Sequence, residues 1–137
     1  MPSSLREALL RDEGVRLKVY TDSRGVPTIG VGRNLRDKGI SMAEAEMLLE
    51  NDLRDAFRIA DHLPWITDLD EPRRNVIFNM AFNLGVQGVL GFTKTLELVK
   101  QGRYVEAAAE MLRSEWAKQV GARAERLALQ MEHGSWR

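Results

Sequence analysis

One stretch near the N-terminus decides the fold: Arg11-Asp12-Glu13-Gly14-Val15-Arg16-Leu17-Lys18-Val19-Tyr20-Thr21-Asp22-Ser23-Arg24-Gly25-Val26-Pro27-Thr28-Ile29-Gly30-Val31-Gly32. A helix leads into it, because Ser4 and Glu7 form a capping-box pattern that starts a helix near Leu5. Gly14 is a typical residue for ending that helix. The stretch therefore opens at the last turn of a short helix, where Glu13 is placed.

Strands and turns follow this helix. Apolar and polar side chains alternate from Val15 to Tyr20, which predicts a strand with one buried face. Residues 21–25 have turn chemistry, and residues 28–32 read as a second short strand whose glycines indicate a tight bend. With a third short strand near Asn34, the pattern predicts a small antiparallel sheet.

The remainder of the chain has helical patterns. Ser41 and Glu44 form a second capping box, and the apolar spacing after it predicts one long helix from about 42 to 60. Further helices are expected from about 71 to Gly85, then, after a turn at 86–90, near 93–100, 104–113, 115–119 and 121–132. The fold class is α+β and mostly helical.

We expect one domain over residues 1–137, built as two lobes. The small lobe, of about 13–60, contains the sheet, and the helical lobe, of about 61–137, includes the N-terminal helix. A cleft between such lobes is the expected place for an extended ligand.

Composition excludes several classes of protein. The chain has 137 residues with 44% apolar and 29% charged side chains, and its 20 basic and 20 acidic residues cancel, which argues against a nucleic-acid binder driven by overall charge. The absence of cysteine excludes disulfides and thiolate zinc sites, and we expect neither a metal nor a cofactor. No apolar stretch resembles a signal peptide or a membrane span, so we expect cytoplasmic synthesis and no stable membrane insertion.

Glu13, Asp22 and Thr28 are the candidate catalytic residues. Two carboxylates on different elements can have different environments, which suits acid and base roles in one reaction. Glu13 stands in the last turn of a helix, where the macrodipole favours cations. A carboxylate there does not stabilise the helix, which argues against a purely structural role. Taken singly, each residue also has an ordinary role, as a surface glutamate, a turn aspartate and a strand-forming threonine.

The spacing of these residues resembles a known family. Glutamate, eight residues, aspartate, five residues and threonine is the pattern of the phage-type lysozymes, or endolysins, of glycoside hydrolase family 24, the group that includes the T-even phage enzyme. The resemblance continues along nearly the whole chain, at Asn79–Gly85, Gly91–Thr93, Trp116–Gln119, Arg123–Arg126 and Gly134–Trp136.

The resemblance implies a lysozyme-like fold and hydrolysis of the β-1,4 bond between N-acetylmuramic acid and N-acetylglucosamine in peptidoglycan. Glu13 would be the general acid, and Asp22 with Thr28 would position water for attack with inversion. It also implies that Arg123 pairs with Glu13 and that Arg126 pairs with Asp12.

Other positions match substrate contacts of the family. These are Gly32, Arg33, Leu35, Asn83 and Phe92. Gly32 and Leu35 can equally be structural, and Asn83 is equally a helix-end residue before Gly85. Arg33 stands where several members have histidine, and could contact substrate carboxylates. We interpret Trp116 as a packing residue behind the site.

Two alternatives remain open. A lytic transglycosylase also uses a glutamate but forms a 1,6-anhydro sugar without a positioned water. A helical module that binds the cell wall or DNA without catalysis is the other, although no helix clusters lysine and arginine. The leading hypothesis is a monomeric muramidase, active in phage lysis, that depends on a holin or another permeabilisation of the membrane to reach peptidoglycan.

Overall fold

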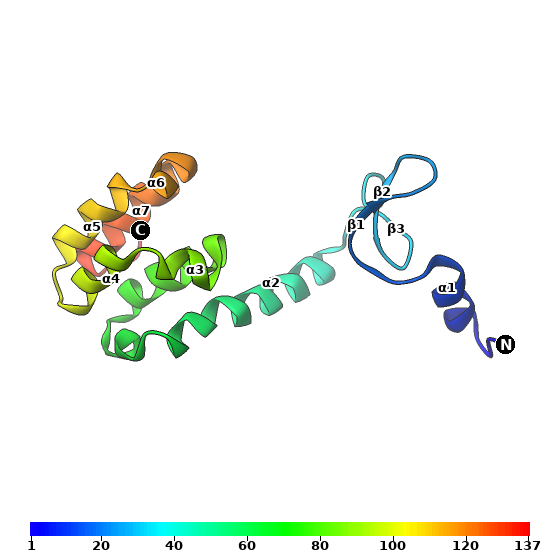
Figure 1. Cartoon of the computed structure of the whole chain (residues 1–137), viewed down its shortest axis with the longest axis horizontal. Coiled ribbons are helices and arrows are strands. Elements are labelled where there is room, and N and C mark those ends of the chain that lie inside the picture. Colours follow the sequence, from blue (N-terminus) through cyan, green and yellow to red (C-terminus); the bar gives the residue numbers. More distant parts are fainter. The chain divides into compact units, whose positions relative to one another are not determined.

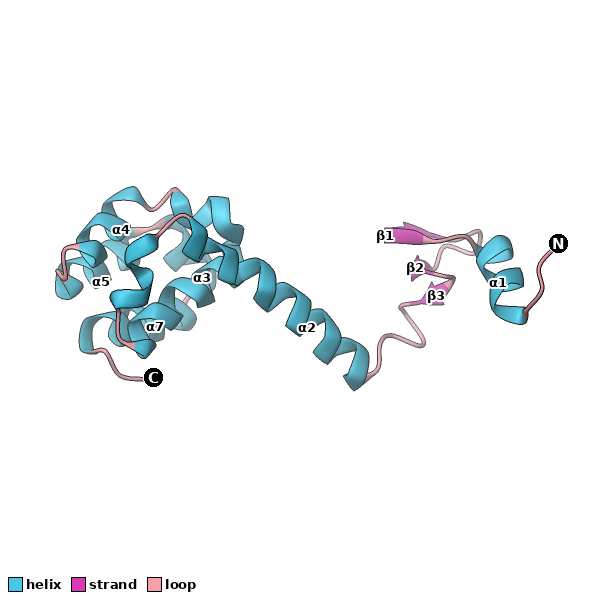
Figure 2. Cartoon of the chain, turned by 90° about the horizontal axis from the view of Figure 1, so that it is seen from below, coloured by secondary structure: helices cyan, strands magenta, loops and turns pink.

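The computed structural model describes all 137 residues and divides them into two compact units, residues 1–48 and 49–137. The expected class is confirmed, because the chain forms seven α-helices and one three-stranded antiparallel sheet. Figure 1 follows the elements in chain order, and Figure 2 shows that the strands belong to the N-terminal unit alone. The predicted organisation into one domain with lobes meeting near residue 60 stays a prediction.

Helix α1 (Leu5–Glu13) forms as its capping signals predict. The Glu7 backbone N–H donates to Ser4 Oγ at 3.1 Å. The Glu7 carboxylate accepts from the Ser3 backbone N–H at 2.7 Å, one residue before the usual capping-box donor. Gly14, at φ +71°, ends the helix and leaves Glu13 as its last residue.

The sheet has the order β1 (Arg16–Thr21), β2 (Pro27–Gly30) and β3 (Arg33–Asn34). Its central strand places Thr28 opposite Tyr20 on one side and Asn34 on the other. The expectation of a buried face on the first strand is wrong, since Leu17 is 86% and Val19 is 61% exposed. Unit 1 consists of this sheet, α1 and the start of one further helix, and none of these forms a layer over that face.

Helix α2 (Met42–Phe57) begins at the predicted capping box. The Ser41 backbone N–H donates to Glu44 Oε1 at 2.9 Å, and the Glu44 backbone N–H donates to Ser41 Oγ at 3.1 Å. The predicted end near residue 60 is wrong, because 3₁₀ turns replace the α-helix over η1 (Arg58–Asp61) and η2 (Pro64–Asp68). Pro64 disfavours the helical conformation at the preceding residue, which the tighter turns accommodate.

The rest of unit 2 is helical: α3 (Glu71–Leu90), α4 (Thr93–Lys100), α5 (Tyr104–Arg113), α6 (Glu115–Val120) and α7 (Ala122–His133). Gly85 leaves helical geometry at φ +78°, as its predicted role as a stop requires. The predicted turn at 86–90 is wrong, because the chain resumes a helix there. Val89 explains this, since its fully buried side chain packs into the core from that segment.

Nearly all of the core lies in unit 2. Its 21 clustered apolar side chains all fall between Ala56 and Met131, whereas unit 1 buries only Val26 and Thr28. Helices α5 and α7 lie side by side in this core (Figure 1). The two units are therefore stabilised in different ways: unit 2 by apolar burial, and unit 1 mainly by backbone pairing and polar contacts.

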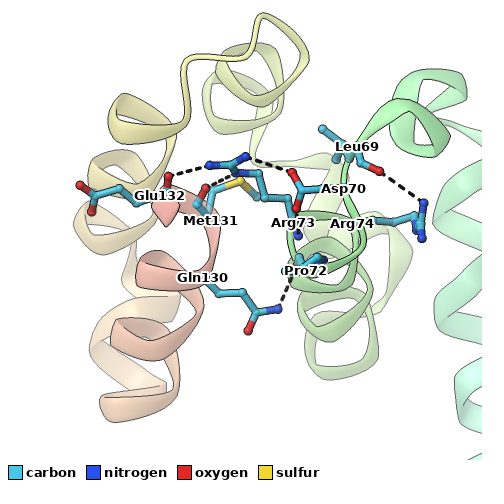
Figure 3. A network of polar contacts seen from close by, with 8 residues as sticks. All are labelled: Leu69, Asp70, Pro72, Arg73, Arg74, Gln130, Met131 and Glu132. Atoms are coloured by element: carbon cyan, nitrogen blue, oxygen red, sulfur yellow. Dashed lines mark hydrogen bonds and ion pairs between the residues drawn. The ribbon is translucent and has the colours of Figure 1, made fainter. Parts of the chain in front are cut away.

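Arg73, in the first turn of α3, joins this helix to the end of α7 (Figure 3). Its Nε donates to Met131 O and its Nη2 to Glu132 O, both at 2.7 Å. The last carbonyls of a helix lack partners within the helix and favour a nearby cation. Gln130 Nε2 adds a bond to Pro72 O at 2.7 Å, so two polar side chains fix α3 against α7.

Candidate active site

The three candidate catalytic residues all lie in unit 1, on the kinds of element predicted for them. Glu13 ends α1, Asp22 follows β1 at the start of the turn to β2, and Thr28 is in β2. Glu13 is exposed, Asp22 is half-buried and Thr28 is only 4% exposed. A helix end, a turn and a strand thus contribute one side chain each.

The Asp22 carboxylate closes its own turn. Its Oδ1 accepts hydrogen bonds from the backbone N–H groups of Arg24 at 2.8 Å and Val26 at 2.9 Å. The bond from Val26 N–H is the main cause that lowers the pKa of Asp22, and the N–H of Arg24 and the charges of Arg24 and Arg36 lower it further, while desolvation acts against them. Asp22 is therefore ionised at neutral pH, and no hydrogen bond from the protein reaches its Oδ2.

Val26, which binds Asp22, also holds Thr28. Its hydroxyl donates to Val26 O at 2.8 Å, and that carbonyl also accepts from the Asp22 backbone N–H at 3.0 Å. A hydroxyl has one proton, which Thr28 gives to Val26, so its oxygen can only accept a further hydrogen bond. Val26 therefore fixes Asp22 and Thr28 together and leaves each with a free acceptor.

Glu13 rests against the turn between β2 and β3. A Cβ atom built on Gly32 would lie 2.5 Å from Glu13 Oε2 and 2.7 Å from its Cδ, so the carboxyl group covers the bare Cα of this glycine. The structure thus brings Glu13 and Gly32 together. Gly32 itself has φ +64°, which favours glycine.

Arg33 makes its contacts inside unit 1. Its Nη1 donates to Glu44 Oε1 at 2.9 Å and to Gly39 O at 3.1 Å. The bond from Arg33, followed by those from Ser41, lowers the pKa of Glu44 to about 2. Leu35 extends the pairing of β2 and β3, because its backbone N–H donates to Pro27 O at 2.9 Å.

In unit 2, Asn83 is oriented by Trp116. The Trp116 indole N–H donates to Asn83 Oδ1 at 2.8 Å, so the Asn83 amide keeps its own N–H groups free. Trp116 is 4% exposed, which confirms its predicted packing role. Phe92 meets the Trp116 ring edge-on at 6.2 Å, and both line a pocket of about 450 Å³ that also presents Lys94 and Glu110. Substrate contacts by Gly32, Arg33, Leu35, Asn83 and Phe92 stay predictions.

Of the three residues predicted to form ion pairs, Arg123 and Asp12 each make side-chain contacts within their own unit. Arg123 donates from Nε and Nη2 to Asn79 Oδ1, at 3.0 and 2.7 Å. Asp12 accepts from Arg11 Nε at 2.9 Å, and Arg126 is exposed. The implied pairs of Arg123 with Glu13 and of Arg126 with Asp12 stay predictions.

Sequence reasoning missed two residues that hold candidate site groups. Val26 could have been found, since an aspartate three residues before a turn glycine is typical of a side chain that bonds the backbone beyond it. Asn79 carried no such signal, because its partner Arg123 is 44 residues away.

Two further features concern metal ions and membranes. No three side chains of histidine, cysteine, aspartate or glutamate are grouped so that they could hold a metal ion. No helix alone has the length and apolar character to cross a membrane, although α3 and α4, which are bent by 103° to each other, meet that criterion as a pair.

The chain is similar in sequence to known proteins over most of its length. The family model for phage lysozyme matches residues 11–131. The chain is 32% identical to a probable T4-type lysozyme of Dictyostelium discoideum, covering 98% of this chain and 97% of the relative. It is 30% identical to the endolysin of Salmonella phage P22, over 80% of this chain and 78% of the relative. It is also 34% identical to the pre-baseplate central spike protein Gp5 of Enterobacteria phage T4, over 92% of this chain but 27% of that longer protein.

The fold and these matches define a glycoside hydrolase of the lysozyme type. The chain belongs to the phage lysozyme family, with peptidoglycan as the substrate of its hydrolase activity. Because 165 aligned positions exceed the 137 residues present here, the Dictyostelium relative has segments that this chain lacks.

Proposed function

We propose that this lysozyme cleaves the β-1,4 bond between N-acetylmuramic acid and N-acetylglucosamine by an inverting reaction. Glu13 is the general acid, and Asp22 with Thr28 holds the attacking water. The observation that carries the proposal is the shared anchor at Val26, which leaves two acceptors, Asp22 Oδ2 and Thr28 Oγ1, on one turn and its adjoining strand.

Two acceptors suit a water molecule that must attack. Water has two O–H groups, and if it donates one to Asp22 and one to Thr28, a lone pair of its oxygen stays free for the anomeric carbon. As the new C–O bond forms, the ionised Asp22 takes the released proton, while Glu13 protonates the leaving glycosidic oxygen. Water that attacks from the face opposite to the leaving group inverts the configuration.

A lytic transglycosylase is the competing reaction. It needs no water at the anomeric carbon, since the sugar's own hydroxyl closes a 1,6-anhydro ring. The anchored pair of Asp22 and Thr28 favours hydrolysis, because a transglycosylase has no use for two acceptors held by the backbone of one residue.

The proposal extends to the setting of the enzyme. The endolysin name of the phage P22 relative supports a role in bacterial lysis by a phage or prophage. We propose that the chain acts as a monomer, is made in the host cytoplasm and reaches peptidoglycan after a holin or another agent permeabilises the membrane.

Product analysis on purified peptidoglycan tests the reaction. We expect muropeptides with a free reducing end that are first released in the α configuration, as judged by NMR before mutarotation. Products released in the β configuration would show retention, and 1,6-anhydro-muropeptides would establish the transglycosylase.

The role of Glu13 is tested by Glu13→Gln, which keeps the shape of the side chain and removes the acid. We expect an unchanged far-UV spectrum and a loss of wall hydrolysis of about 10²–10⁴-fold. Glu46→Gln is the matched control, since Glu46 is an exposed residue of α2 and should retain full activity. Lysis by Glu13→Gln at the rate of the control would contradict the assignment of Glu13 as the general acid.

A further inference from the structure

Gly32, in the turn between β2 and β3, lies against the side chain of Glu13, the last residue of α1. An added Cβ would come within 2.5 Å of Glu13 Oε2, 2.7 Å of Cδ and 3.1 Å of Cγ, and contacts below 3.0 Å essentially never occur for real Cβ atoms. The whole end of the Glu13 side chain, and not only one oxygen, therefore occupies the space above this glycine.

We propose that Gly32 is a positioning residue for Glu13: its bare Cα is the surface on which the carboxyl group of the acid rests. The proposal depends on the proposed role of Glu13 as general acid. It assigns Gly32 a task other than contact with the substrate.

The effect of filling this space falls on the carboxyl group. The turn that carries Gly32 is fixed, because Ile29 pairs with Arg33 across it and Arg33 is held by Glu44. The Glu13 carboxyl is the free end of a flexible side chain on an exposed helix end. A methyl group on Gly32 therefore displaces the carboxyl and leaves the backbone of the turn in place. A displacement of about 1 Å of a catalytic group can cost about 10²-fold in rate.

Gly32→Ala tests the proposal, and Gly30→Ala is its matched control. Both glycines have positive φ, +64° and +69°, so alanine strains the backbone similarly at each. Nothing lies within 4 Å of a Cβ built on Gly30. We expect Gly32→Ala to lower kcat about 10–100-fold with little change in KM, while Gly30→Ala keeps kcat within about threefold.

A spectroscopic measurement separates positioning from general damage. With ¹³C-labelled glutamate, the Glu13 Cδ resonance should shift in Gly32→Ala and stay unchanged in Gly30→Ala. If Gly32→Ala does not fold, the double variant Glu13→Ala/Gly32→Ala should fold and melt close to Glu13→Ala/Gly30→Ala, since the colliding side chain is gone.

Three results would overturn the proposal. They are equal losses of kcat in the two alanine variants, an unmoved Glu13 resonance in Gly32→Ala, and a rise in KM alone, which would make Gly32 a substrate contact. A failure of the proposed function looks different: Glu13→Gln would remain active, while the resonance of Glu13 would still respond to Gly32→Ala.

Discussion

At the scale of the residue, the backbone of Val26 organises two candidate catalytic side chains. The N–H of Val26 binds Asp22 Oδ1, and its carbonyl accepts from both the Thr28 hydroxyl and the Asp22 backbone N–H. Val26 is itself buried, with 8% of its surface exposed. Because the protein itself uses the Thr28 proton and Asp22 Oδ1, the groups left free are two acceptors, Asp22 Oδ2 and Thr28 Oγ1. They can bind only a molecule that donates hydrogen bonds.

Thr28→Val and Thr28→Ser test the free acceptor at this scale. Valine has the shape of threonine without the hydroxyl, so we expect kcat to fall by about 10²-fold through loss of water alignment. Stability should fall by only about 0.5–1.5 kcal/mol, since Val26 O keeps its bond from Asp22 N–H. Serine should recover most of the activity. Steady-state kinetics and urea unfolding give both quantities. Full activity in Thr28→Val together with a loss in Thr28→Ser would mean that the methyl group, not the hydroxyl, matters.

At the scale of the element, Arg33 and Glu44 join β3 to the N-terminus of α2. Glu44 serves two functions at once: it completes the capping box with Ser41 and accepts from the Arg33 guanidinium. The same guanidinium reaches Gly39 O, so the loop between strand and helix is closed by one side chain from each end. The helix start predicted from the capping pattern is thereby also the point where the sheet is attached.

The pH dependence of this junction follows from the Glu44 pKa. That pKa is about 2, below its ordinary value of 4.5, so the ion pair stabilises the folded chain fully above about pH 4.5 and ceases to do so as the pH falls towards 2. We expect Arg33→Gln to raise the Glu44 pKa in an NMR titration. The stability difference between wild type and Arg33→Gln should be largest above pH 4.5 and shrink below it.

Arg58→Gln is the control for that experiment. The Arg58 side chain is 72% exposed, and its guanidinium Nη1 lies 3.8 Å from Oδ1 of Asp55, which is 70% exposed. Its effect on stability should be small at every pH. A Glu44 pKa that stays near 2 without Arg33 would assign the shift to Ser41 alone.

At the scale of the whole molecule, the free energy of unfolding is concentrated in one unit. The clustered apolar core belongs to residues 49–137, while residues 1–48, which contain Glu13, Asp22 and Thr28, bury one apolar side chain. A unit held mainly by backbone pairing opens locally more readily than one with a buried core. The candidate catalytic residues thus belong to the less stabilised part of the chain.

Hydrogen exchange measures this difference. We expect the slowest amides in α3, α5 and α7, and faster exchange throughout α1 and the sheet. Ile77→Ala, at a side chain 2% exposed in the core, should cost about 2–5 kcal/mol and speed exchange in the three slow helices by the corresponding factor. Leu17→Ala, at a side chain 86% exposed, should change stability by less than about 0.5 kcal/mol. Equal protection of the amides in the two units would contradict the concentration of the unfolding free energy in residues 49–137.

Local signals in the sequence determined most of the elements and the candidate catalytic set. Ser4 and Ser41 mark helix starts, Gly14 and Gly134 mark helix ends, and these are decided within a few residues by backbone hydrogen bonding and φ. The order of Glu13, Asp22 and Thr28 on helix, turn and strand was likewise readable, because each position follows from a local pattern.

Only the tertiary structure decided the rest, since it depends on contacts between residues far apart in the chain. Burial of Val89 makes a helix of the segment predicted as a turn, and the bond of Arg123 to Asn79 spans 44 residues. The alternation in β1 predicted a buried face that unit 1 does not provide, because alternation shows which side chains share a face but not what covers it. The space above Gly32 was also decided by the tertiary structure. The sequence shows a glycine, and only packing shows that Glu13 lies against it.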